Sequence, residues 1–494
     1  MNAIFFPFKL LDNLLFLPAA EATGMSEDRI RYVFLLFLSI PLGLVMKYLL
    51  HPSRVNNTAR HSYSLLIGLI YGLMCFGFFQ MTLLLAIVGS CYVLLLTASP
   101  KVVQNYTMIW MLTCISAAHI YRLITDYGGY HLDFTGPLMV IVQRTTYVAF
   151  ALHDGIARDP SSLNEDQQKQ RIKQKPTPME YFGYNFFFAS FLAGPAVTYK
   201  QYHDFISGAN FTSVKPPKSD EGKDHVEEPS NVGVVLKKTV AGIIMMALYV
   251  ILNIYFPYEI ILADMNFIKR LAVLFVAGFV IRARYYFIWI MSDSGCNAAG
   301  LGFSGYNKLG YAQWDIASGM DVFGIEFGTS LRNIVNSWNI ATSNWLRRVC
   351  YERVKFVDHT IATFFLSAWW HGFYPAYYLL FVTIAMNTLA ARKLRRVLRH
   401  HFQVNLFTKW GYDVFTWFCC MTCLNITCMC ITLLYLGATL QHLGNYYYVT
   451  IWFPLLIIVL PIGRKSRREQ KPESTDTTKE GQQTSTEPKE TKSE

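Results

Sequence analysis

Apolar runs long enough to cross a membrane recur along most of this chain of 494 residues. A spanning helix needs about 20 mostly apolar residues. Runs of this kind cover 32–50, 62–79, 81–97, 104–124, 135–152, 234–263, 267–291, 414–436 and 447–462. Charged residues make up only 16% of the chain and apolar residues 53%, which excludes an ordinary soluble globule and predicts an integral membrane protein.

The spacing of these runs predicts an all-α fold, a polytopic helical bundle of roughly ten or eleven spans and half-spans around a buried chamber. The runs 62–79 and 81–97 are nearly contiguous, which predicts a helical hairpin with almost no loop. The aromatic run 181–191 stops before Gly194 and Pro195, a pattern typical of a half-helix or re-entrant element. The Gly-rich stretch 292–358 is too long for an ordinary loop, and such irregular segments are commonly functional.

Basic residues lie beside the last spans of the chain, which has a net charge of +11. The clusters at 392–399 and 464–468 predict that these ends face the cytosol. We therefore expect an integral-membrane domain, 1–463, followed by a disordered cytosolic tail, 464–494, rich in Lys, Glu, Ser and Thr. Because the basic residues sit between apolar runs and not on one polar, aromatic-bearing surface, we expect no nucleic-acid partner.

Several common catalytic signatures are absent from the sequence. It has no Gly-rich phosphate loop ending in Lys-Ser or Lys-Thr, no H-E-x-x-H motif for a metal, and no G-x-S-x-G nucleophile elbow. None of the 12 histidines has an aspartate five positions later, which excludes the His-x-x-x-x-Asp acyltransferases. The remaining candidate is His371, an imidazole in an oily run. By itself, a lone histidine of this kind is more often structural than catalytic.

Two segments together change the interpretation of His371. The first combines tryptophan, an amide and a basic pair: Trp338, Asn339, Trp345, Arg347 and Arg348. The second is a Trp-His-Gly-x-x-Pro-x-Tyr-x-x-x-Phe motif that runs from Trp370 to Phe381. In this order they resemble the membrane-bound O-acyltransferase family, MBOAT. Four further segments fall in the order seen in its lysophospholipid acyltransferase branch, namely 133–137 (DFTGP), 154–155 (DG), 192–195 (LAGP) and 302–305 (GFSG).

The resemblance implies a catalytic pair, which corresponds by motif position to Asn339 and His371. A neutral imidazole can accept the proton of an attacking hydroxyl, and an amide N–H can hold that hydroxyl or stabilise the developing oxyanion. Neither role needs a metal, a cofactor or a covalent acyl-enzyme, so acyl-CoA is expected only as a co-substrate. Asn333, Asn336 and Asn344 lie close by in the sequence and are alternatives to Asn339.

The other motif residues have a binding and a structural interpretation. Arg347 and Arg348 are expected either to meet the phosphates of coenzyme A or to anchor a helix end at the interface. Gly302 and Gly305 permit tight turns, next to a substrate or simply in a loop. The tryptophans are expected to line the acyl channel or to serve only in packing, and they are Trp338, Trp345 and Trp370.

Within the branch the sequence is most similar to enzymes that reacylate lysophosphatidylethanolamine and lysophosphatidylserine. This resemblance implies a multi-pass protein of the endoplasmic reticulum membrane. Its expected partners are acyl-CoA, with oleoyl-CoA as a good donor, the lysophospholipid and the surrounding membrane lipids. Two alternatives remain open from the sequence: an MBOAT enzyme that acylates a protein, and a polytopic transporter.

Overall fold

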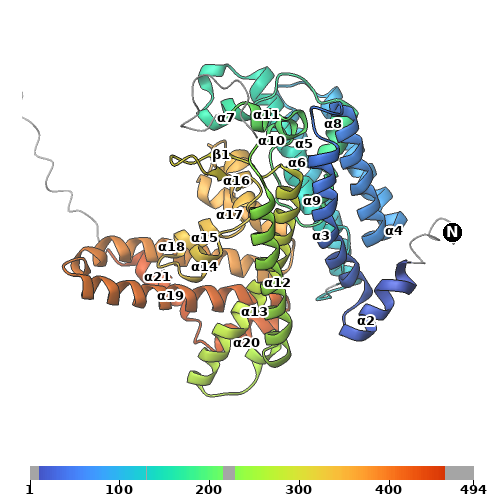
Figure 1. The fold of residues 1–494 in the computed structure, drawn as a ribbon. Coiled ribbons are helices and arrows are strands. Elements are labelled where there is room, and N and C mark those ends of the chain that lie inside the picture. Colours follow the sequence, from blue (N-terminus) through green and yellow to red (C-terminus); the bar gives the residue numbers. More distant parts are fainter. Residues whose placement is uncertain (1–10, 130, 215–227, 462–494) are drawn as a thin grey trace, which may run out of the picture.

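The computed structural model describes residues 11–129, 131–214 and 228–461 (Figure 1). Almost all of its regular structure is helical, and the strands in this part form one short hairpin, β1 (Gly305–Tyr306) with β2 (Ala312–Gln313). The predicted all-α membrane bundle is thereby confirmed. The predicted tail, 464–494, lies outside the described residues.

Within these residues, six helices are long and apolar enough to cross a membrane. They are α3 (Glu27–Leu44, continued by the π-turn Val45–Leu49), α4 (Asn57–Thr97), α5 (Val103–Thr125), α12 (Val232–Tyr255), α13 (Phe267–Ala299) and α19 (Leu406–Leu433). Two further helices, α20 (Leu436–Gly444) and α21 (Val449–Val459), are long and apolar enough only when taken together, and they meet at 69°. The predicted ten or eleven spans and half-spans include helices that fall outside this length and hydropathy criterion: α6 (Thr135–Leu152), α17 (His359–His371) and α18 (Pro375–Leu398).

The helix α4 is a hairpin and not one straight rod. Its backbone leaves the helical region at Gly77, where φ is +72°, a value that glycine adopts without strain. Residues on both arms meet α8 (Pro178–Asn185): Ser64 Oγ donates to Gly183 O, and the ring of Tyr92 lies 4.9 Å from that of Tyr181. In a straight helix Ser64 and Tyr92 would be about 40 Å apart. The predicted hairpin is therefore present, with its turn at Gly77.

The helix α6 runs through the middle of the bundle, and nearly all of its residues are buried. It carries one fully buried cation, Arg144. The guanidinium donates to the carbonyls of Tyr184, Asn185 and Ser190, at 2.7–3.0 Å, and to the Ser190 hydroxyl. Burial of a charge is costly unless hydrogen bonds compensate it, and these four bonds fix the segment between α8 and α9 (Phe188–Phe191) against α6.

The stretch expected to be irregular, 292–358, contains more helix than predicted. Its first residues belong to α13, which continues to Ala299. It then holds the short helices α14 (Val322–Glu326), α15 (Leu331–Ser337) and α16 (Ile340–Leu346) and the π-turn Arg347–Tyr351. Side-chain caps explain these starts, because Asp321, Ser330 and Asn339 each accept a backbone N–H of the helix that follows. The remaining short helices are α2 (Leu17–Thr23), α7 (Glu165–Gln170), α10 (Tyr199–Ser207) and α11 (Ala209–Thr212).

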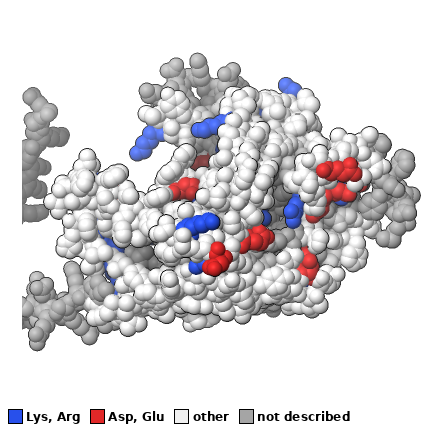
Figure 2. Space-filling model, turned by 90° about the horizontal axis from the view of Figure 1, so that it is seen from below, with Lys and Arg blue, Asp and Glu red and all other residues white. Residues whose placement is uncertain are grey.

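In the view of Figure 1, α12 and α13 lie side by side and α18, α19 and α21 extend to one side of them. The short helices α15, α16 and α17 lie where these groups meet. Figure 2 shows a face on which charged side chains are sparse and white residues dominate, as the low content of charged residues requires. Of the motif residues in this region, Trp345 and Trp370 are buried, whereas Asn339, Arg347 and His371 are partly exposed.

Candidate active site

Asn339 lies at the N-terminus of α16 in a left-handed conformation, with φ 45° and ψ 57°. Asparagine tolerates this region better than most residues, and it is also a good helix cap. Its Oδ1 accepts the backbone N–H of Thr342 at 3.4 Å. Within the described part of the chain, the Nδ2 amide group has no hydrogen-bond partner. The carboxamide oxygen of Asn339 therefore caps α16, and its amide N–H donors make no hydrogen bond to the described residues.

A short backbone segment holds Asn339 from both sides. Asp321 N donates to the carbonyl of Ser337 at 2.9 Å, and Ile340 N donates to the carbonyl of Gly319 at 2.7 Å. The segment is itself anchored, because Ser318 Oγ donates to Asp293 Oδ2, which also accepts Lys238 Nζ at 2.7 Å. A left-handed residue persists where its surroundings determine it. The backbone hydrogen bonds to Gly319 and Asp321, together with the contacts of Ser318 and Lys238 with Asp293, hold Asn339 in this conformation; we call these contacts the polar anchor.

Two side-chain hydrogen bonds set the register of α16 on α6. Gln143 Nε2 donates to Thr342 Oγ1 at 2.8 Å, and Trp345 Nε1 donates to Thr146 Oγ1 at 2.9 Å. In each helix the two partners are three residues apart and so share a face. Trp345 is fully buried, and its ring lies 5.9 Å from that of Trp370. These contacts bring the helix capped by Asn339 against the helix that ends at His371.

His371 is the last residue of α17, and aromatic rings surround its imidazole. The ring centroids of Trp370, Tyr377 and Phe381 lie 4.7, 6.1 and 5.1 Å away. The side chain is only partly exposed, and among the described residues it has no hydrogen-bond partner. An imidazole in an apolar setting favours its neutral form, which is the form that can act as a general base.

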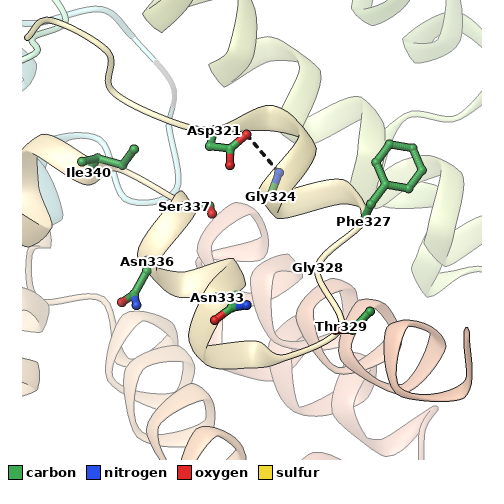
Figure 3. A pocket seen from close by; sticks show the side chains of 9 residues that line it. All are labelled: Asp321, Gly324, Phe327, Gly328, Thr329, Asn333, Asn336, Ser337 and Ile340. Atoms are coloured by element: carbon green, nitrogen blue, oxygen red, sulfur yellow. Dashed lines mark hydrogen bonds between the residues drawn. The ribbon is translucent and has the colours of Figure 1, made fainter. Parts of the chain in front are cut away.

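A pocket of about 490 Å³ with mixed polar and apolar lining is formed by residues 321–340 (Figure 3). It lies between α14, α15 and the start of α16, and Ser337 and Ile340, close neighbours of Asn339, line it. The alternative amides Asn333 and Asn336 also line this pocket and are exposed. Of the nearby amides, Asn339 alone caps α16, the helix that packs against α17.

Comparison with known proteins identifies the family. The model of the membrane-bound O-acyltransferase family matches residues 102–433. The chain belongs to the membrane-bound O-acyltransferase family. It is 33% identical to membrane-bound glycerophospholipid O-acyltransferase 1 of Mus musculus, over 90% of this chain and 92% of the relative. It is 34% identical to membrane-bound glycerophospholipid O-acyltransferase 2 of Homo sapiens, over 92% and 88%.

A third relative is lysophospholipid acyltransferase 6 of Drosophila melanogaster, at 36% identity over 90% of this chain. The chain spans 62% of the length of that fly protein. The predicted family and its O-acyltransferase class are thereby confirmed. The roles of individual residues in this MBOAT chain stay predictions, and the geometry above shows which of those residues lie together.

The two arginines of the MBOAT motif follow α16 and form ion pairs. Arg348 makes a bidentate pair with Asp166, at 2.6 and 2.8 Å, while Arg347 contacts Glu352 at 2.7 Å and Asp166 at 3.3 Å. Burial raises the pKa of Asp166, but the hydrogen bond and charge of Arg348 outweigh burial and hold that pKa below its ordinary value. The Arg347 side chain is 43% exposed and that of Arg348 16%. Arg347 is therefore the better placed to meet a soluble anion.

Three other predicted residues, Trp338, Gly302 and Gly305, take part in packing and in backbone turns. Trp338 packs against rings of α13 and lies 5.2 Å from Trp289. A Cβ at Gly302 would come 2.0 Å from Asn297 Oδ1, so this glycine makes room for α13. Gly305 begins β1 with φ +118°. The glycines thus act through local backbone geometry.

Sequence reasoning missed the residues that hold this MBOAT site together. They are His119, Gln143, Thr146, Lys238, Asp293 and Thr342. Four of them, His119, Gln143, Thr146 and Lys238, could have been noticed, because each is a polar side chain inside an apolar run. What the runs do not show is which polar side chains meet. No group of three or more His, Cys, Asp or Glu side chains that could hold a metal ion occurs in the described residues.

Proposed function

We propose that this MBOAT protein is a lysophospholipid acyltransferase that moves an acyl group from acyl-CoA to the free glycerol hydroxyl of a lysophospholipid. One observation supports the proposal most strongly: the helix capped by Asn339 packs against the helix that ends at His371. The Nδ2 group of Asn339 makes no hydrogen bond to the described residues. The names of the relatives support a glycerophospholipid as the acceptor. We place the enzyme in the endoplasmic reticulum membrane, with lysophosphatidylethanolamine or lysophosphatidylserine as acceptor and oleoyl-CoA as donor.

The reaction needs one proton to move and no covalent enzyme intermediate. His371 accepts the proton of the acceptor hydroxyl while that oxygen attacks the thioester carbonyl. The new C–O bond forms, the C–S bond breaks, and the proton passes from His371 to the sulfur of the departing coenzyme A. The Nδ2 group of Asn339 donates to the oxygen that becomes negative in the tetrahedral state.

The two substrates need different surroundings. The acyl chains need apolar walls, which the rings of Trp370, Tyr377 and Phe381 supply around the imidazole. The phosphates of coenzyme A need cations in water, and Arg347 is one that is partly exposed. A membrane enzyme that joins both environments suits an amphipathic donor and a lipid acceptor.

A panel of acceptors tests the proposal with purified protein in lipid nanodiscs. Initial rates are measured with oleoyl-CoA and each of four acceptors at equal subsaturating concentration: the ethanolamine, serine and inositol lysophospholipids and a peptide. We expect the ethanolamine and serine lysolipids to exceed the inositol lysolipid by roughly tens-fold, because headgroup differences in such sites are typically worth about 1–3 kcal/mol. A preference for the inositol lysolipid would contradict the proposed acceptor, and transfer only to a peptide would contradict the proposed function.

A further inference from the structure

A second histidine, His119 of α5, contacts the chain on both sides of His371. Its Nε2 lies 3.1 Å from the carbonyl of Trp370 and must donate to it, since a carbonyl only accepts. Its ring also lies against Gly372, where a Cβ would come within 3.2 Å of His119 Nδ1. The centroid of Phe373 is 6.4 Å away. One buried side chain on another helix therefore touches the residues before and after His371.

These contacts occur where α17 stops. Gly372 leaves the helix with φ +124° and ψ −168°, so the carbonyls of the last turn lose their ordinary partners. An unsatisfied carbonyl in the apolar interior is costly. His119 satisfies the carbonyl of Trp370, whose indole Nε1 is fixed separately by the carbonyl of Met139 at 2.9 Å.

From this geometry we infer that His119 is a positioning residue for His371: its imidazole fixes the turn that sets the direction of the catalytic ring. The inference rests on the proposed function. The His371 side chain has no hydrogen bond of its own among the described residues, so its direction depends on its backbone and on ring packing. A displacement of the base by about 1 Å can lower a rate about 100-fold without changing what binds.

The chain supplies a matched control in His442 of α20. It is also a fully buried histidine, and its Nε2 donates to a backbone carbonyl, that of Ile426, at 2.9 Å. Its ring centroid lies 5.2 Å from that of Tyr446, and among the described residues no hydrogen bond or ring pair joins it to His371. Replacing either histidine by phenylalanine keeps a ring and removes the donor, so both variants share the structural cost. Only one of them should lose catalysis.

The experiment compares His119→Phe, His119→Gln and His442→Phe in nanodiscs, with wild type and His371→Ala in the same assay. We expect His119→Phe to lower kcat about 10-fold to 100-fold with KM for both substrates unchanged. His119→Gln, whose amide nitrogen can reach the same carbonyl, should recover most of that kcat. His442→Phe should keep the wild-type kcat for each folded molecule and shift only the thermal unfolding midpoint.

Three results would overturn the inference: wild-type kcat in His119→Phe, equal losses of kcat in His119→Phe and His442→Phe, or no recovery with glutamine. Active wild type with inactive His371→Ala upholds the proposed function independently of these variants. A wild-type protein that transfers nothing to any lysophospholipid would contradict the proposed function and, with it, this inference.

Discussion

Asn339 and His371 lie on adjoining short helices, yet opposite kinds of surroundings hold them. Asn339 has a left-handed backbone fixed through the segment 318–321 by the ion pair of the partly exposed Lys238 with the buried Asp293. His371 lies among aromatic rings, with one polar contact, from His119, to the backbone beside it. The amide is held by charge and hydrogen bonds, and the imidazole is held mainly by packing.

The difference follows from what each group has to do. A donor to an oxyanion must already point at the place where charge develops, because reorientation during the reaction would cost free energy. A general base must remain neutral until it takes its proton, which a dry, apolar environment favours. Polar anchoring of the base itself would work against that requirement.

Removing the base should have the largest effect on rate. His371→Ala is expected to lower kcat about 10²-fold to 10⁴-fold, since that is the typical contribution of a general base. Thermal unfolding and membrane insertion should stay close to wild type, because His371 has no hydrogen bond of its own among the described residues. A folded variant with wild-type turnover would show that the packed region does not hold the base.

A change of one group at Asn339 separates its two roles. Asn339→Asp keeps an oxygen to cap α16 and tolerates the left-handed conformation, but it loses the N–H donor. We expect kcat to fall about 10²-fold to 10³-fold with little change in unfolding temperature. Asn344→Asp is the control and should be milder. The reverse order of these two variants would assign the wrong amide.

The polar anchor can be broken at a distance from the site. Lys238→Met leaves the buried carboxylate of Asp293 unpaired, which typically costs about 3–5 kcal/mol. We expect a lower unfolding temperature together with a lower kcat, because the segment that holds Asn339 loosens. Lys237→Met, on the exposed neighbour, is the control and should change neither. If Lys238→Met lowered the unfolding temperature but left kcat unchanged, the ion pair with Asp293 would not be needed to position Asn339.

The smallest effect is expected at the solvent-facing end of the site. Arg347→Ala should raise KM for oleoyl-CoA about fivefold and leave KM for the lysolipid unchanged. A fivefold change corresponds to about 1 kcal/mol, the contribution of one exposed hydrogen bond to a phosphate. Arg348→Ala removes the bidentate partner of Asp166 and should lower the unfolding temperature more than Arg347→Ala does. A change in KM for the lysolipid would contradict this assignment and indicate that Arg347 contacts the acceptor instead of coenzyme A.

The sequence was sufficient for the class of fold, and family motifs led to the prediction of the two central residues. Hydropathy predicts the bundle, since apolar runs in a membrane protein have few alternatives to helix. The hairpin of 62–97 was also predicted from the apolar runs, although its turn lies at Gly77 and not between residues 79 and 81 as the runs indicated. His371 and Asn339 were accessible because family motifs mark their positions.

The supports of these two residues were not accessible from sequence, because they come from distant parts of the chain. His119 meets Trp370 across 251 positions, and Gln143 meets Thr342 across 199. The left-handed backbone of Asn339 also has no clear local signature. Each pairing depends on how the helices pack, and the apolar runs do not specify that packing.

The most direct test of direct transfer by His371 follows the acyl group through one turnover. Purified protein in nanodiscs is mixed with oleoyl-CoA labelled in the acyl chain, first without acceptor and then with lysophosphatidylethanolamine. We predict no label on the protein in the first case and, in the second, one labelled phosphatidylethanolamine for each coenzyme A released, with neither product from His371→Ala. A labelled acyl-protein that passes its label to the lysolipid would contradict the account.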